Sequence, residues 1–142
     1  MNKDTKTQKG ALAMKNLSKM LKYGKYFLID RGDLSREVAI ESIPYVQKHI
    51  IKMANSKNIL VHVATNLLES MVKNTKPTRA EVNDIINTLN DGADGLVLAA
   101  ETAIGKHPIA CVSMIKSLLY RFENPIKIPK IIVSMLLLKK IM

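Results

Sequence analysis

Three polar residues follow three apolar runs of the sequence, and their spacing gives them the clearest potential for chemistry. Thr65 comes 32 residues after Asp33, and Glu101 comes 36 residues after Thr65. One strand–helix–strand unit takes about 30 residues, so each interval corresponds to one such repeat. In a barrel of these units the strand ends converge on one rim, where catalytic residues gather. The spacing therefore predicts that two carboxylates and a hydroxyl share a catalytic rim.

Each of these residues also has an ordinary structural interpretation. The pair Gly32-Asp33 after a strand is typical of a turn. Threonine is a common strand residue, and Glu101 has the position of an acid at a helix N-terminus. Only the joint placement of the three residues favours a functional interpretation.

The elements that must position these residues alternate between strands and helices. Short apolar runs predict strands, and longer segments with apolar residues three or four positions apart predict helices. Buried strands that alternate with amphipathic helices are typical of a parallel sheet with helical cover. We predict an α/β fold, a partial (β/α)8 TIM barrel of about three βα units with parallel strands. The strands are expected at Tyr26–Ile29, Ile59–Ala64 and Gly95–Ala99, and the helices at Ile43–Asn55, from Thr78 to near Gly92, and from near Pro108.

Two of the helices carry start signals. Thr78 and Glu81 have the spacing of a capping box, in which each side chain accepts a backbone N–H at the start of the helix. Gly92 follows where a helix C-cap is expected, and Pro108 is a favourable first-turn residue. The positions expected to be buried are Ile43, Val46, Ile50 and Met53 in the first helix, Val82, Ile85, Ile86 and Leu89 in the second, and Ile109, Val112, Ile115, Leu118, Leu119 and Phe122 in the third, with Cys111 beside them.

Side-chain alternation along the middle strand gives a prediction about its two faces. If Thr65 points to the barrel mouth, Val61 and Val63 share its side, and His62 faces the helices. His62 is then expected to be a boundary residue and not a catalytic one.

The net charge of +10 is concentrated at the two ends of the chain. Residues 1–25 contain seven Lys and one acidic residue, and residues 125–142 contain four Lys and no acidic residue. Residues 26–124 hold eleven basic and eleven acidic residues. A nucleic-acid-binding domain should carry basic clusters and stacking aromatics on its folded elements, so nucleic-acid binding is not expected. We predict a basic N-terminal segment with a possible helix at Ala11–Leu21, a folded region, and a Lys/Leu/Ile-rich tail.

The cysteine content and hydropathy pattern indicate a soluble protein of the cytoplasm. The single Cys111 excludes an internal disulfide and fits a reducing compartment. The basic N-terminus lacks the apolar run of a signal peptide. The apolar stretch Ile131–Leu138 is too short to span a bilayer, which needs about 20 residues, so no membrane association is expected.

Four blocks of sequence resemble the last three βα units of the pyruvate kinase barrel. They are Arg31-Gly32-Asp33-Leu34, the run from Ala64 to Met71 (ATNLLESM), the run from Pro77 to Glu81 (PTRAE), and the run from Ala99 to Ala103 (AAETA). The resemblance extends from about Tyr26 to Glu123 and ends before the tail at residues 125–142.

The resemblance implies phosphoryl transfer between phosphoenolpyruvate and ADP, which yields pyruvate and ATP, as in glycolysis. Asp33 would be a ligand of Mg²⁺ or Mn²⁺ beside the substrate carboxylate, and Gly32 would offer its backbone to that carboxylate. Thr65 would contact the substrate near the carbon that gains or loses a proton, with Glu101 as a further catalytic residue. A hard cation held by oxygen ligands suits an enolate, because it stabilises the developing charge. A homo-oligomer is possible.

This sequence also departs from the family pattern. Ala99 stands where the family has a serine, Asn66 replaces a glutamine, and Ser35 replaces a glycine. The strand that carries the family's Lys-Ile-Glu signature is not recognisable, and the residues of the K⁺ site are absent. We expect a divergent, truncated form with little activity of its own, because one metal carboxylate without the phosphoryl-stabilising lysine loses most of the electrostatic stabilisation.

Two alternatives to a truncated kinase remain open at this stage. One is a divergent metal-dependent lyase that forms a pyruvate enolate, for which the missing serine at Ala99 is the only support. The other is a non-catalytic remnant that docks on intact subunits through its open sheet edges.

Overall fold

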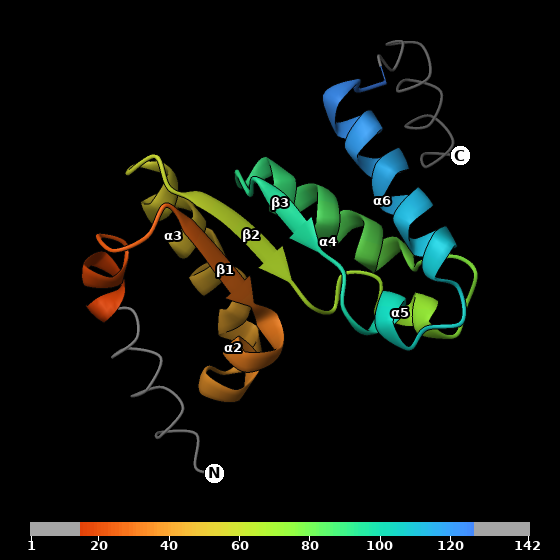
Figure 1. Ribbon diagram of the computed structural model, residues 1–142, viewed down its shortest axis with the longest axis horizontal. Helices are drawn as coiled ribbons and strands as arrows, with labels where there is room; N and C mark the ends of the chain where they lie inside the picture. The colour runs from red at the N-terminus through yellow and green to blue at the C-terminus, as the bar shows by residue number, and fades with distance from the viewer. Residues whose placement is uncertain (1–14, 127–142) are drawn as a thin grey trace, which may run out of the picture.

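The computed structural model describes residues 15–126, which form a three-stranded sheet with helices (Figure 1). Residues 15–20 are helical and precede the first strand. The elements then follow in the order β1 (Tyr26–Asp30), α2 (Arg31–Glu37), η1 (Ile40–Ser42), α3 (Ile43–Asn55), β2 (Leu60–Ala64), η2 (Glu69–Val72), α4 (Arg79–Asn90), β3 (Gly95–Val97), α5 (Ala100–Ala103) and α6 (Pro108–Glu123).

The sheet is parallel, with the strand order β1-β2-β3. Asp30 pairs with Ala64, and Ala64 pairs with Val97, so the carboxyl ends of the three strands are level. The predicted α/β fold with three parallel strands is confirmed. The sheet is not closed, and it corresponds to part of a (β/α)8 barrel.

The alternation predicted for β2 is wrong. Val61 and Val63 are completely buried, in a cluster with Ile51 and Ala54 of α3, so they face the helices. His62 lies on the opposite face, where an added Cβ on Gly95 would come within 2.0 Å of its Cδ2. The prediction failed because it was extrapolated back from Thr65, whose φ of 67° takes it out of the strand conformation.

Helices cover only one face of the sheet. In Figure 1, α3 and α4 lie behind the strands, and no described helix lies in front of them. On the open face, Tyr26, Leu28, Leu60 and Val97 are 66%, 56%, 42% and 40% exposed. The two buried clusters are Leu17, Leu21, Ile29, Ile51, Ala54, Ile59, Val61 and Val63 around β1, β2 and α3, and Leu67, Leu68, Met71, Ile85, Leu89, Cys111 and Leu118 between η2, α4 and α6.

The buried faces of α3 and α6 differ from those expected. In α3 the buried positions are Gln47, Ile51 and Ala54, one residue along from the predicted stripe, of which Ile50 and Met53 are partly buried against the first cluster. The buried amide of Gln47 has a hydrogen-bond partner, since its Nε2 donates to Thr88 Oγ1 of α4 at 3.1 Å. In α6, Cys111 and Leu118 are buried, whereas Ile109 is 81% exposed. The remaining predicted positions of α6 are partly or largely exposed, since the described elements pack against only a narrow part of this helix.

The start and end of α4 agree with the sequence prediction. Thr78 Oγ1 accepts the N–H of Glu81 at 3.2 Å, and Glu81 Oε2 accepts the N–H of Thr78 at 2.7 Å, which completes the capping box. Gly92 follows the helix with a φ of 100°, a conformation that glycine adopts without strain.

The segment before β1 packs on the sheet. Leu17 and Leu21 are buried in the first cluster, as the predicted helix at 11–21 requires, whereas Met20 is 51% exposed. Most of the predicted basic segment and nearly all of the predicted tail lie outside the described residues. No helix among residues 15–126 is long and apolar enough to cross a membrane.

Candidate active site at the carboxyl ends of β1 and β2

The sequence Asp30–Asp33 forms the start of a helix and not the free turn that ordinarily follows a strand. Asp30 ends β1 and is also the N-cap of α2, with its Oδ1 accepting the N–H groups of Gly32 at 2.9 Å and Asp33 at 3.2 Å. An aspartate at this position satisfies N–H groups that have no partner within the helix. The backbone of Gly32 and Asp33 is therefore held at the level of the strand end.

Thr65 meets this helix start from the end of β2. Its Oγ1 accepts a second hydrogen bond from the Gly32 N–H at 2.9 Å, and it lies 2.7 Å from Ala64 O and 3.2 Å from Asp30 Oδ1. The hydroxyl can donate its one proton to either of these oxygens. The structure thus brings together Gly32 and Thr65, two of the residues predicted to bind substrate.

Thr65 and Asn66 both have the left-handed backbone conformation, with φ values of 67° and 55°. For a β-branched residue such as threonine this conformation is strained, and it persists only where neighbouring groups enforce it. The strained backbone thus lies in the loop that carries the Thr65 hydroxyl.

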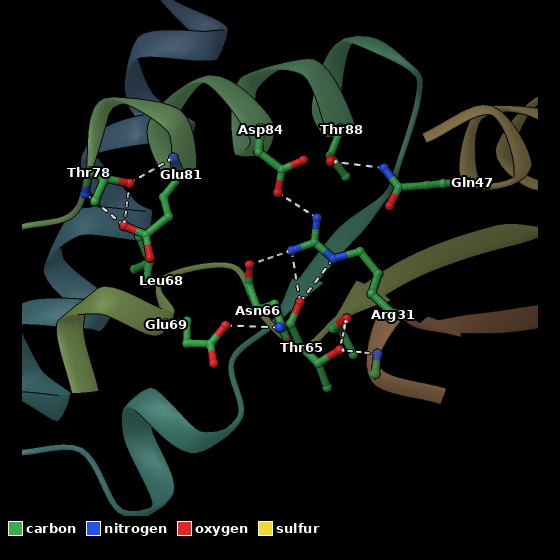
Figure 2. A network of polar contacts seen from close by, with 12 residues as sticks. Arg31, Gln47, Thr65, Asn66, Leu68, Glu69, Thr78, Glu81, Asp84 and Thr88 are labelled. Atoms are coloured by element: carbon green, nitrogen blue, oxygen red, sulfur yellow. Dashed lines mark hydrogen bonds and ion pairs between the residues drawn. The ribbon is translucent and has the colours of Figure 1, made fainter. Parts of the chain in front are cut away.

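Arg31 holds this strained loop, as Figure 2 shows. Its Nε and Nη2 donate to Thr65 O at 2.9 and 2.8 Å, and Nη2 also donates to Asn66 O at 2.7 Å. Its Nη1 forms an ion pair with Asp84 of α4, and the arginine side chain is 10% exposed. Arg31 therefore connects the end of β2 to a helix that lies far along the chain.

The side chain of Asp33 points away from this centre. Its carboxylate is 74% exposed and pairs with Arg36 at 3.2 Å, and that arginine is 79% exposed. Only the backbone N–H of Asp33 belongs to the contacts around Asp30. The predicted metal ligand is thus an accessible carboxylate at the rim.

Glu101 is placed differently from Asp33 and Thr65. It is 1% exposed, and its two carboxylate oxygens accept the N–H of Leu68 at 3.4 Å and of Ala99 at 3.1 Å. No hydrogen bond within residues 15–126 joins it to Gly32, Asp33 or Thr65. Cys111 lies beside it, and burial first, then the Glu101 charge, raises the pKa of the Cys111 thiol.

Glu81 joins α4 to the loop after β2. Its carboxylate accepts hydrogen bonds from the N–H and hydroxyl of Ser70, at 2.7 and 2.6 Å, and from the N–H and hydroxyl of Thr78, at 2.7 and 2.9 Å. Burial opposes its ionisation, but these four hydrogen bonds lower the pKa of Glu81 below its usual value. Figure 2 shows the capping contacts on the same helix that carries Asp84.

Comparison with known proteins identifies the family of this chain. The sequence matches the family described as "Pyruvate kinase, barrel domain" over residues 6–112, which is about three quarters of the chain.

The chain belongs to the pyruvate kinase family.

Individual relatives agree with this membership. The chain is 44% identical over 115 residues to a pyruvate kinase of Thermotoga maritima, a match that covers 81% of this chain and 25% of that protein. It is 45% identical over 102 residues to a pyruvate kinase of Methanocaldococcus jannaschii, covering 72% of this chain and 23% of the relative. A crystal structure of a Cryptosporidium parvum pyruvate kinase superposes with a TM-score of 0.77 at 34% identity, over 81% of this chain and 24% of that one. The chain spans about a quarter of the length of these relatives.

The described residues do not form a complete divalent-cation site. No group of three or more His, Cys, Asp or Glu side chains within residues 15–126 has the geometry to hold a metal ion. Asp33 could supply one carboxylate, but Mg²⁺ takes six ligands, most of them water and substrate oxygens once one or two carboxylates are bound. A pyruvate kinase-type metal centre thus needs ligands beyond those that the described residues bring together.

Sequence reasoning missed two residues of this site, Asp30 and Arg31. The N-cap role of Asp30 had a usable signal, because an aspartate before a short amphipathic stretch is a favoured helix start. The role of Arg31 had none, since Thr65 and Asp84 lie 34 and 53 positions away in the sequence.

Proposed function

We propose that this chain supplies part of the active site of a pyruvate kinase, which transfers a phosphoryl group between phosphoenolpyruvate and ADP. The observation that carries the proposal is the meeting of Gly32 and Thr65 at two neighbouring strand ends, with the exposed carboxylate of Asp33 next to Gly32 in the chain. The Gly32 N–H is held by Asp30 and by the Thr65 hydroxyl, and the Thr65 carbonyl is held by Arg31. Such preorganised donors stabilise negative charge without reorganising during the reaction.

The proposed roles follow the family resemblance. The N–H of Gly32 would bind the substrate carboxylate, and the Thr65 hydroxyl would lie near the carbon that exchanges a proton. The exposed carboxylate of Asp33 would contribute one ligand to Mg²⁺ or Mn²⁺, and K⁺ is expected for the family. Glu101 would act at the third strand end, and its two hydrogen bonds to backbone N–H groups support a positioning role over contact with substrate.

We propose that the chain alone is a very poor catalyst. The chain spans about a quarter of its relatives' length, and its described carboxylates do not gather into a metal site. Phosphoryl transfer depends almost entirely on positioning and charge stabilisation, so an incomplete site loses most of the rate enhancement. We also propose that the chain consists of a basic segment at residues 1–25, a barrel region at residues 26–124 and a tail at residues 125–142. Its proposed location is the cytoplasm, as is general for the family.

Fragment complementation tests this function. The part of the Thermotoga maritima pyruvate kinase that this chain does not match would be produced separately and mixed with the 142-residue chain. Pyruvate formation would be followed with lactate dehydrogenase. We expect turnover that requires Mg²⁺ or Mn²⁺ and both fragments, and that falls at least 100-fold with Asp33→Ala. The matched control is Glu123→Ala, which removes an exposed carboxylate at the end of α6 and should leave the rate unchanged.

A second candidate function is non-catalytic docking on other barrel segments. The open face of the sheet favours it, because Tyr26 and Leu28 expose more than half of their surface there. An uncovered apolar face of this kind marks an interaction surface. Co-elution of the two fragments without turnover would support docking and contradict catalysis. Turnover by the isolated chain that is abolished by Asp33→Ala would contradict the proposal that it is a poor catalyst.

A further inference from the structure

Helix α6 carries more apolar surface than the described residues cover. Its buried residues Cys111 and Leu118 pack in the second cluster. A further set of apolar side chains, called here the outer stripe, consists of Ile109, Val112, Leu119 and Tyr120, which are 81%, 47%, 36% and 60% exposed. The side of a surface helix that faces away from the core ordinarily carries polar and charged residues. Figure 1 shows α6 at one end of the molecule, beyond α4, so the outer stripe is open to an additional partner.

The chain itself continues from this helix into an apolar segment. Residues 127–142 lie outside the described residues, but their sequence follows a helical pattern. Apolar side chains recur at the spacing i, i+4, i+7 and i+11, which one face of a helix requires, at Ile131, Met135, Leu138 and Met142. As a helix, residues 131–142 would extend about 18 Å, and the outer stripe from Ile109 to Tyr120 extends about 16 Å. The two apolar surfaces therefore match in length.

We propose that residues 131–142 pack antiparallel along the outer stripe of α6 and form a helical hairpin with it. Residues 124–130 would make the reversal, which is within the range of about 2–8 residues usual between packed helices. They include Pro125 and Pro129, and proline ends a helix because it lacks the N–H that the next turn needs. The inference goes beyond the proposed function and does not depend on it, because the outer stripe contains none of the residues at the candidate active site.

Two physical arguments favour this occupant over a second copy of the chain. The tail is joined to the end of α6 by a short connection, so its effective concentration at the stripe is in the millimolar range. A second copy at micromolar concentration competes poorly with it. A helix of about 12 residues is also only marginally stable alone in water, so the tail gains its order from an apolar surface within its reach.

A spin label on the tail tests the contact in the full-length chain. Lys140→Cys provides the attachment point without removing an apolar side chain, and Cys111 is completely buried, so the label attaches to the introduced thiol. In the ¹⁵N-labelled chain we expect loss of the amide signals of Ile109 and Val112. The signals of Ile51 and other α3 residues should be retained, because α3 lies at the other end of the molecule in Figure 1. Reduction of the label should restore the lost signals.

A matched pair of tail variants tests which face of the tail makes the contact. Leu138→Asp puts a charge on the face that carries Met135 and Met142, whereas Leu137→Asp puts the same charge on another side of the same segment. Because burial of an unpaired charge is unfavourable, Leu138→Asp should lower the ratio of docked to undocked tail by about tenfold or more, and the Ile109 and Val112 signals should return. Leu137→Asp should leave the signal loss in place.

A second pair of variants tests the helix side of the contact. Ile109→Asp places an acidic residue in the first turn of α6, which stabilises a helix, so this variant is expected to fold and to release the tail. Ser117→Asp is the control, because it adds the same charge to an exposed position of α6 outside the outer stripe. It should leave the signal loss at Val112 unchanged.

Four outcomes would overturn the inference. One is full retention of the Ile109 and Val112 signals in the spin-labelled chain. Another is their loss in a mixture of spin-labelled ¹⁴N chain with unlabelled ¹⁵N chain, which would assign the stripe to a second copy. A third is loss at Tyr26 and Leu28 instead, which would place the tail on the open face of the sheet. The fourth is an equal response of the two variants in either pair, since a specific hairpin requires them to differ.

Discussion

The carboxyl ends of β1 and β3 both carry acidic residues, but they use them in opposite ways. At the end of β1 the Asp33 carboxylate is 74% exposed, and the backbone beside it is held at the rim. Beyond the end of β3 the Glu101 carboxylate is 1% exposed and accepts hydrogen bonds from two backbone N–H groups. Similar spacing in the sequence therefore does not imply equal roles, and the loop after each strand decides whether a carboxylate is available to a ligand.

The largest loss of folding stability is expected on replacement of Glu101, and it would test the difference between the two strand ends. Its replacement by alanine leaves the N–H groups of Leu68 and Ala99 without their acceptor in the interior, and hydrogen bonds to charged groups contribute about 1.5–3 kcal/mol each. We expect Glu101→Ala to lower the free energy of unfolding by about 3 kcal/mol, measured by urea denaturation. Asp33→Ala should change it by less than about 0.5 kcal/mol, as is usual for exposed positions. Equal losses in the two variants would break the distinction between the strand ends.

A smaller effect is expected at Arg31. Arg31→Met keeps most of the buried side-chain volume but removes the hydrogen bonds to the carbonyl groups of Thr65 and Asn66 and the ion pair with Asp84. We expect a loss of about 2 kcal/mol, together with a change in the backbone conformation of Thr65 that three-bond NMR couplings would report. Arg36→Met is the matched control, because that arginine is 79% exposed and its ion pair contributes little. An unchanged φ at Thr65 would show that the loop keeps its conformation without the guanidinium.

The smallest effect concerns the pH dependence of stability through Glu81. The pKa of Glu81 is lowered in the folded state from its usual 4.5, so the unfolded chain binds a proton more readily. Its contribution to stability is thus present above pH 4.5 and is lost as the pH falls through the lower, folded-state pKa. Glu81→Gln should flatten the fall in the thermal midpoint over that acidic range. Glu69→Gln is the control, since Glu69 makes one exposed contact with Asn66, and a matching flattening there would contradict the assignment.

The sequence allowed the strand–helix order, the parallel sheet and the capping box of α4 to be predicted because these features depend on local patterns. Tyr26–Ile29 and Ile59–Ala64 are short, mostly apolar runs, and Thr78 and Glu81 are three residues apart. The orientation of His62 could not be predicted in the same way, since it depends on where the strand conformation stops. Thr65 leaves that conformation at the point where Arg31, 34 residues earlier in the chain, donates to its carbonyl.

For the same reason, only some features of the candidate site could be predicted from the sequence. Its residues could be placed at common strand ends from their spacing, whereas their availability could not. The burial of Glu101 depends on the Leu68 backbone, and the occupation of the Gly32 N–H depends on Asp30 and Thr65 together. These are contacts between distant segments, which a single sequence does not specify locally.

The junction between β1 and α2 has a consequence for how this chain can change in evolution. Asp30 is the last residue of the strand and also the cap of the helix, so no connecting residue lies between the two elements. A one-residue insertion there would displace α2 relative to the end of β1 and would separate the Gly32 N–H from Thr65. In the connection from β2 to α4, residues 73–76 are exposed, whereas Leu67, Leu68 and Met71 before them are buried. Length variation among descendants of this sequence should therefore accumulate in the second connection and be purged from the first.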